Sequence, residues 1–113
     1  MGNAANDIAA SFKSQTGNIF AFFISKDFTA FQGHFPESPL LPGIVQMEIA
    51  LFCVRKILNN NGAVLKEIKK AKFVKPVLPD SAVYAVITES GENFNITIKG
   101  DSETYSQISI AVS

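Results

Sequence analysis

The feature that most constrains the fold is a helix that is apolar on nearly every side. Pro42 suits the first turn of a helix, where a backbone N–H has no partner inside the helix, and helical spacing runs from Ile44 to Asn60. Apolar side chains fill almost every position as far as Cys53. Other elements must therefore enclose this helix on most sides. The run is still too short and too polar to span a bilayer, since it contains Gln46, Glu48, Arg55 and Lys56.

The rest of the chain predicts a sheet that wraps this helix. A weak strand over residues 8–15, a turn over 16–18 and a stronger strand over 19–25 form an opening hairpin. Four more strands are expected, over residues 65–74, 83–89, 94–99 and 104–112. This order predicts one α+β domain over residues 1–113, with an antiparallel sheet of five to six strands around one long central helix. Residues 1–7 are expected to lie outside the folded part.

Composition favours a globular protein and excludes several classes of function. The 113 residues are 47% hydrophobic and 18% charged, and the formal net charge of zero argues against nucleic-acid and membrane-surface binding. One His and one Cys leave no plausible zinc site and no intramolecular disulfide. The amino-terminal residues lack the basic and apolar regions of a secretion signal, so we expect a cytoplasmic protein.

Glu48 is the residue of the apolar helix that most needs an explanation. Its neighbours one turn away, Ile44 and Phe52, cannot pair with a carboxylate. If this face is buried, an ionised carboxylate there costs several kcal/mol, which favours the protonated form and would make Glu48 a usable general acid. The alternative is that Glu48 faces a solvent gap or a subunit interface.

His34 lies in a segment dense in Pro and Gly, residues 26–43, which predicts a long, ordered and functional loop. A single loop His is commonly only a surface residue. Here Gly33 lets the backbone pass closely, and neighbouring prolines stiffen the segment. Gly43 then places free backbone N–H groups at the start of the helix, where developing negative charge is stabilised. A base, an acid and an oxyanion donor therefore occur within one short segment.

The segment from Phe31 to Glu48 resembles the active-site segment of the bacterial (3R)-hydroxyacyl-acyl carrier protein dehydratases. Its sequence, FQGHFPESPLLPGIVQME, matches the family pattern G-H-F-P-x-x-P-x-x-P-G followed by an acidic helix residue at every fixed position. The segment AKFVKPVLPD, over residues 71–80, resembles the strand K-F-x-x-P-V-x-P-G-D of the same family. The resemblance covers roughly residues 8–113. Because the chain has a shorter amino-terminal part than the fatty-acid enzymes of the family, it is most similar to accessory dehydratases of specialised acyl-chain pathways, such as aryl polyene clusters.

The resemblance implies the hot-dog fold and a lyase that dehydrates a (3R)-hydroxyacyl-acyl carrier protein to the trans-2-enoyl thioester in fatty acid or related acyl-chain biosynthesis. It implies that His34 takes the proton from carbon 2, that Glu48 protonates the departing hydroxyl, and that the Gly43 N–H holds the thioester oxygen. Candidate walls of the acyl tunnel are Phe31, Phe35 and Phe52. No cofactor of the protein's own is implied, because the substrate arrives on the phosphopantetheine of the carrier protein.

The resemblance also implies a homodimer, possibly a trimer of dimers, with His34 from one subunit and Glu48 from the other at each site. An acidic acyl carrier protein would need a basic surface, and residues 55–75 carry a net charge of +6. The candidate carrier-binding residues are Arg55, Lys56, Lys69, Lys70, Lys72 and Lys75. The alternative is that this stretch is an ordinary solvated strand and helix end.

Three departures from the family pattern leave other functions open. Glu37 stands where the fatty-acid enzymes usually have Gly, and Phe52 stands where they usually have Gln, which removes a hydrogen bond to Glu48. We also expect no amino-terminal helix, because only 33 residues precede His34. One alternative function is a hot-dog thioesterase that activates water with Glu48. Another is a non-catalytic subunit that binds an acyl carrier.

Overall fold

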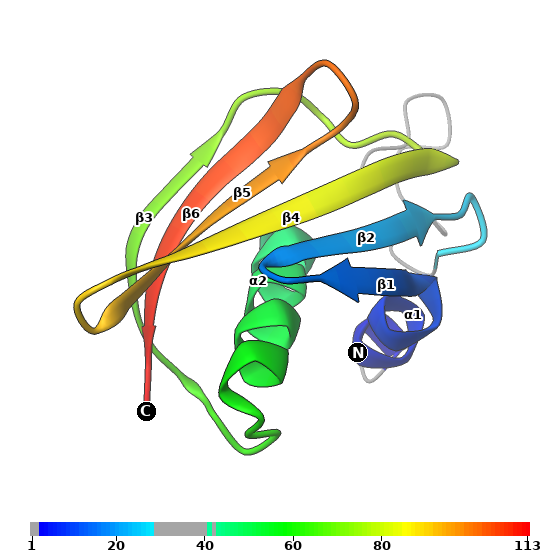
Figure 1. Cartoon of the computed structure of the whole chain (residues 1–113). Helices are drawn as coiled ribbons and strands as arrows, with labels where there is room; N and C mark the ends of the chain where they lie inside the picture. The colour runs from blue at the N-terminus through cyan, green and yellow to red at the C-terminus, as the bar shows by residue number, and fades with distance from the viewer. Residues whose placement is uncertain (1–2, 29–40, 42) are drawn as a thin grey trace.

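The computed structural model describes residues 3–28, 41 and 43–113, with side chains described from residue 6 onward. Within these residues the sheet has six strands, all antiparallel, in the order β1-β2-β4-β5-β6-β3 (Figure 1). The elements are α1 (Asn3–Ser11), β1 (Phe12–Thr16), β2 (Ile19–Ile24), α2 (Gly43–Leu58), β3 (Leu65–Phe73), β4 (Ser81–Ser90), β5 (Asn93–Lys99) and β6 (Thr104–Val112). The predicted antiparallel sheet of five to six strands with one long helix is confirmed, and the sheet has six.

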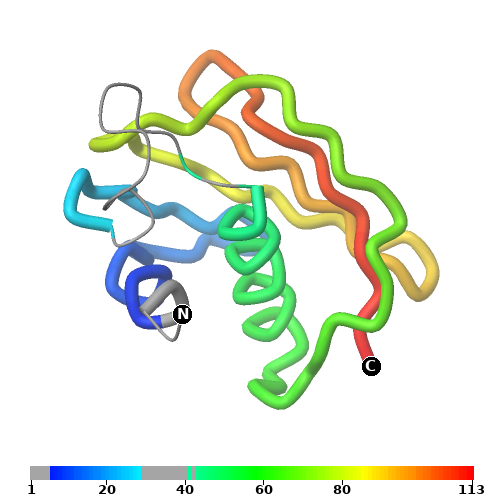
Figure 2. Tube along the Cα trace, turned by 180° about the vertical axis from the view of Figure 1, so that it is seen from behind, coloured from blue at the N-terminus to red at the C-terminus, as the bar shows by residue number. Residues whose placement is uncertain are grey.

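The long helix α2 lies across the concave face of the sheet (Figure 2) and packs against β4, β5 and β6. Its side chains at Ile49, Ala50, Cys53 and Val54 are fully enclosed, as its apolar sequence requires. The helix ends where Asn59 adopts a left-handed φ of 53°, and the N–H of Asn60 then donates to the Arg55 carbonyl at 3.0 Å. This hydrogen bond closes the helix two residues before Asn60, where helical spacing predicted its end.

The predictions for residues 3–11 are wrong, whereas the hairpin that follows them is confirmed. Residues 3–11 form the helix α1, where we expected a disordered stretch followed by a strand from residue 8. Alanines at four positions of this helix favour helical backbone, and the side chain of Ile8 is 2% exposed. The Ser11 hydroxyl donates to the Ile8 carbonyl at 2.8 Å within the last turn. Because α1 packs against α2, tertiary contacts stabilise this helix, which the apolar pattern of its nine residues does not predict.

Most of the predicted functional loop, residues 29–40 and 42, lies outside the described residues. Two of the three described hairpin turns use glycines in left-handed conformations, Gly17 at φ 59° between β1 and β2 and Gly91 at φ 63° between β4 and β5. Of the described helices, neither has both the length and the apolar character that crossing a membrane would need.

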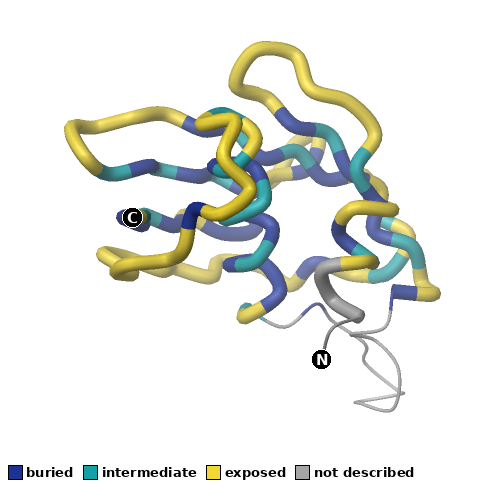
Figure 3. The backbone as a smooth tube through the Cα atoms, turned by 90° about the horizontal axis from the view of Figure 1, so that it is seen from below, coloured by how far each residue is buried: buried dark blue, intermediate teal, exposed yellow. Residues whose placement is uncertain are grey.

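Strand β3 differs from its neighbours because it is exposed along its whole length (Figure 3). It is an edge strand, paired only with β6 within the described sheet. Its Phe73 and Ile68 stand opposite Ser106 and Ile110, which are buried on the concave face. Phe73 and Ile68 therefore face the same side as α2, yet they remain 47% and 48% exposed. The concave face ends in apolar side chains that the described residues leave half exposed.

Ile98→Val is expected to lower the free energy of unfolding by about 1 kcal/mol, because Ile98 is fully buried on β5 and the change removes one methyl group. Ile19→Val on β2 is the matched control, since Ile19 is 44% exposed. Urea unfolding at one protein concentration measures both variants. Equal effects of the two substitutions would contradict the described core.

The Cys53 thiol is expected to resist labelling in the folded protein. Burial raises the pKa of this thiol, and nearby Lys56 opposes that shift only in part. The folded state thus holds the thiol proton more tightly than the unfolded state. The contribution of the protonated thiol to the free energy of unfolding is complete below about pH 8.5 and is lost as the pH rises further. A disulfide reagent at pH 8 should react slowly with native protein and rapidly in urea. Fast labelling without urea would contradict this placement.

Candidate active site

Gly43 begins α2 and allows a close approach that any side chain would prevent. A Cβ atom at this position would lie 2.9 Å from Cζ of the Phe73 ring. The Gly43 N–H is one of the first four of the helix, which have no acceptor inside it. Gly43 lines a groove of about 270 Å³ between the start of α2 and the chain that follows β3. The predicted oxyanion donor therefore stands at an accessible, positively polarised helix terminus.

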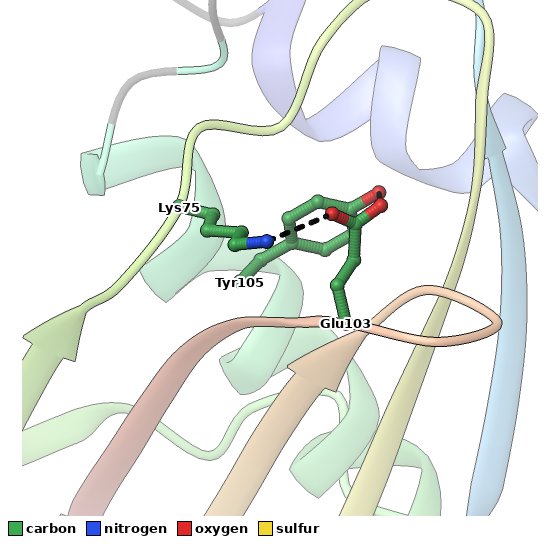
Figure 4. A network of polar contacts seen from close by, with 3 residues as sticks. All are labelled: Lys75, Glu103 and Tyr105. Carbon is green, nitrogen blue, oxygen red and sulfur yellow. Dashed lines mark hydrogen bonds and ion pairs between the residues drawn. The ribbon is translucent and has the colours of Figure 1, made fainter.

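Polar contacts fix the wall of this groove opposite α2. The N–H groups of Val74 and Lys75 both donate to the Tyr105 carbonyl, at 2.8 and 3.2 Å. The Tyr105 hydroxyl lies 3.3 Å from the Glu103 carboxylate, which also pairs with Lys75 Nζ at 3.6 Å (Figure 4). Burial, and then the neighbouring Glu103 carboxylate, raise the pKa of Tyr105, so the phenol keeps its proton and remains a donor. The wall is held in place without any ligand.

Glu48 lies in a different place, on the side of α2 that faces α1. It lines a cavity of about 250 Å³ together with Ile8, Leu51, Phe52 and Arg55. The Glu48 side chain is only partly buried in the single chain. The alternative that Glu48 faces a gap or a subunit interface therefore fits the structure better than full enclosure. Arg55 also lines this cavity, but its Nε donates to the Ala63 carbonyl at 2.7 Å and is therefore engaged elsewhere.

Phe52 borders the Glu48 cavity as one member of an aromatic cluster. Its ring meets those of Phe12 and Phe22 edge to face, with centroids 5.4 and 5.9 Å apart. Lys56 Nζ lies 5.1 Å from the Phe52 centroid and 5.2 Å from that of Phe12. Phe52 therefore supplies an apolar wall and no hydrogen bond to Glu48. The other two tunnel candidates, Phe31 and Phe35, lie outside the described residues.

Within the described residues, Gly43 and Glu48 do not line the same cavity. Gly43 and Glu48 are five residues apart, so at about 100° per residue they point roughly 140° away from each other around α2. They line two separate cavities accordingly. His34, the predicted base, lies outside the described residues. Among the described residues, no group of three His, Cys, Asp or Glu side chains could hold a metal ion.

The basic candidates for carrier binding divide into two groups. Lys56 lies over the Phe12 ring of β1, and its neighbour Arg55 lines the Glu48 cavity. The others lie on or just after β3, at the opposite edge of the sheet: Lys69, Lys70, Lys72 and Lys75. Lys69 pairs with Glu67 at 3.1 Å, and Lys75 pairs with Glu103. The stretch of residues 55–75 is thus continuous in sequence and divided in space.

Gln46 is the residue of this region that our sequence reasoning missed. We read it only as a polar interruption of the apolar helix. Its side chain is 2% exposed and lines the Gly43 groove, and within the described part of the chain its Oε1 has no hydrogen-bond partner. The signal that could have marked Gln46 was its amide in an otherwise apolar, enclosed helix. A buried polar group normally has a hydrogen-bond partner, so such a residue is a candidate for binding.

Comparisons with known proteins agree with the resemblance. Residues 10–109 match the family model of the ApeI-like proteins, described as ApeI dehydratase. The 3-hydroxyacyl-[acyl-carrier-protein] dehydratase FabZ of Sinorhizobium fredii is 35% identical over 72 residues, 58% of this chain and 47% of that protein. FabZ of Rhodopseudomonas palustris is 36% identical over 70 residues, 55% of this chain and 46% of that protein. The chain spans about half the length of these curated relatives.

Two solved structures share the fold over nearly the whole chain. The dehydratase heterocomplex ApeI:P from Xenorhabdus doucetiae matches with a TM-score of 0.76 and 24% identity, covering 88% of this chain and 91% of that chain. An uncharacterized protein from Erwinia carotovora subsp. atroseptica matches with a TM-score of 0.67 and 27% identity, covering 91% of this chain and 90% of that chain. The predicted hot-dog fold is confirmed. With the family model matching residues 10–109, the chain belongs to the ApeI-like dehydratase family.

Proposed function

We propose that this protein removes water from a (3R)-hydroxyacyl thioester carried by an acyl carrier protein and forms the trans-2-enoyl thioester. The observation that carries the proposal is the placement of Glu48 on α2, at an apolar cavity, in a member of a dehydratase family. The relatives FabZ are named as 3-hydroxyacyl-[acyl-carrier-protein] dehydratases, which supports the substrate class.

The proposed reaction uses three groups of this chain. His34 takes the proton from carbon 2 as the electron pair of that bond forms the double bond to carbon 3. The bond from carbon 3 to oxygen breaks, and the Glu48 carboxyl gives its proton to that oxygen, so water leaves. The Gly43 N–H stabilises the thioester oxygen while it carries negative charge. A proton passing from the imidazolium to the Glu48 carboxylate, directly or through water, resets both groups.

We propose a dimer because the acid and the oxyanion donor line different cavities of one chain. A second copy placed against the concave end of β3 would cover Ile68 and Phe73, which are apolar and about half exposed. The free edge of β3 would also find backbone partners there. In such a pair, Glu48 of one subunit would meet His34 and Gly43 of the other. The neighbour from Xenorhabdus doucetiae is described as a heterocomplex, so a different hot-dog subunit is the alternative partner.

The carrier protein is proposed to dock beside β3. Lys69, Lys70 and Lys72 lie along this exposed strand, and Lys75 follows it at the groove that Gly43 lines. An acidic carrier would be attracted to these charges, and its arm would enter the adjacent groove. Docking at β3 would place the phosphopantetheine arm of the carrier on the Gly43 side of α2.

The test is incubation of the purified protein with a (3R)-hydroxyacyl-acyl carrier protein. The expected product has lost the mass of one water and carries the conjugated enoyl thioester. Release of a free thiol, surviving in His34→Ala, would instead identify a thioesterase. Tight carrier binding without turnover at any acyl length would identify a non-catalytic subunit.

A further inference from the structure

The Gly43 groove contains an acceptor that nothing in the described protein satisfies. Oε1 of Gln46 is buried, lines the groove and has no hydrogen-bond partner among the described residues. Leaving such a group unpaired disfavours the folded state, whereas Leu or Met would fill the same space without that penalty. A buried, unpaired acceptor on a residue that lines a groove is therefore suited to a ligand that brings an N–H or O–H donor.

The groove is formed before any ligand arrives. On one side, the Leu41 N–H donates to the Val77 carbonyl at 2.8 Å and holds the entry to α2 against the segment after β3. On the other, the Tyr105 carbonyl accepts from both Val74 and Lys75. Gln46 thus lines a groove with fixed walls, where a single hydrogen bond can discriminate between ligands.

The position of Gln46 indicates which part of a thioester it meets. Gln46 lies three residues after Gly43, about 4.5 Å further along the axis and on a neighbouring part of the helix surface. Helical side chains lean toward the amino-terminal end, so its amide reaches back toward the level of Gly43. Glu48 lies about 160° away around α2, at the other cavity. Within one chain Gln46 therefore serves the Gly43 end of the ligand rather than the side with the acid.

We propose that Gln46 accepts a hydrogen bond from the first amide N–H of the thioester's thiol arm, and so selects thioesters of pantetheine-type thiols. The inference rests on the proposed function and adds to it the part of the substrate that Gln46 reads. If the thioester oxygen sits at the Gly43 N–H, the next donor along the arm is the amide two methylenes from the sulfur. The arm would approach from the Lys75 end of the groove, where this exposed cation would attract an acidic carrier.

The test combines two substrates with three forms of the full chain. One substrate is the 3-hydroxyacyl thioester of N-acetylcysteamine. The other is the thioester of O-acetyl-2-mercaptoethanol, in which an ester oxygen replaces the amide N–H. The variant Gln46→Met keeps the side-chain length and removes the acceptor. The control Gln107→Met makes the same change at an exposed position on β6, away from the groove.

The unchanged protein is expected to prefer the amide substrate by about tenfold in kcat/KM, equivalent to about 1.4 kcal/mol. Gln46→Met should reduce this preference to about one, while Gln107→Met should retain it. A preference that persists in Gln46→Met, or its absence from the unchanged protein, overturns the inference. So does an equal loss of activity on both substrates, because a merely structural Gln46 would act that way.

The same data separate this inference from the proposed function. If carrier-bound substrate is dehydrated but the substrate preference does not depend on Gln46, only the inference fails. If no 3-hydroxyacyl thioester is dehydrated, the proposed function fails and the inference fails with it. Should Gln46→Met not fold, as judged by circular dichroism, Gln46→Leu takes its place with the same two outcomes.

Discussion

Glu48→Gln is expected to lower kcat/KM for dehydration by a factor of about 10²–10⁴, the usual contribution of a positioned general acid. Gln has the shape of Glu but no proton to give to the departing hydroxyl. Stability should change little, because Glu48 is partly exposed and forms no ion pair within the described residues. Enoyl formation from a 3-hydroxyacyl-acyl carrier protein measures the rate, and urea unfolding measures the stability.

Glu92→Gln is the matched control, since Glu92 lies exposed in the turn between β4 and β5. It should leave the rate unchanged. His34→Ala should lower kcat/KM by a similar factor of about 10²–10⁴, since the two groups act on the same substrate. Full dehydration activity in both variants would remove the proposed roles, even if the protein remains a dehydratase by another route.

Mixing two inactive variants is expected to restore activity if each site takes His34 from one subunit and Glu48 from the other. In a dimer of His34→Ala with Glu48→Gln, one site carries both substitutions and the other carries neither. Random pairing makes about half of the dimers mixed, so co-expression should recover about a quarter of the unchanged activity. Either variant alone should show almost none.

Two affinity tags allow the mixed dimer to be isolated, and it should then have about half of the unchanged activity per dimer. If His34 and Glu48 act within one chain, every site carries one of the two substitutions and mixing recovers nothing. This result would overturn the proposed shared site. A mass measurement that finds only monomers would overturn it as well, or would point to a different subunit as the partner.

The individual strands and the long helix were predictable because their signals are local. Alternation in β5 and the continuous apolar run of α2 each specify an element without reference to the rest of the chain. The amino-terminal helix was not predictable in this way. Its nine residues contain one large apolar side chain, Ile8, and the contact of α1 with α2 stabilises it. Short helices depend on tertiary packing more than on their own propensity.

The candidate site was predictable as a set of residues and not as an arrangement. The motif from His34 to Glu48 marks the groups capable of acid, base and oxyanion chemistry. The sequence also shows that α2 must be enclosed, and the stretch of residues 55–75 marks the basic charge. Each of these conclusions depends only on residue type and spacing, which the chain carries by itself.

Only the tertiary structure decided where these groups stand. Helical rotation turns Gly43 and Glu48 toward different cavities, and the path of the chain sends Lys56 and Lys72 to opposite edges of the sheet. Burial then left the Gln46 oxygen without a partner in a groove whose far wall comes from residues after β3. Proximity in sequence does not determine direction around a helix, and direction decides which groups can touch one substrate.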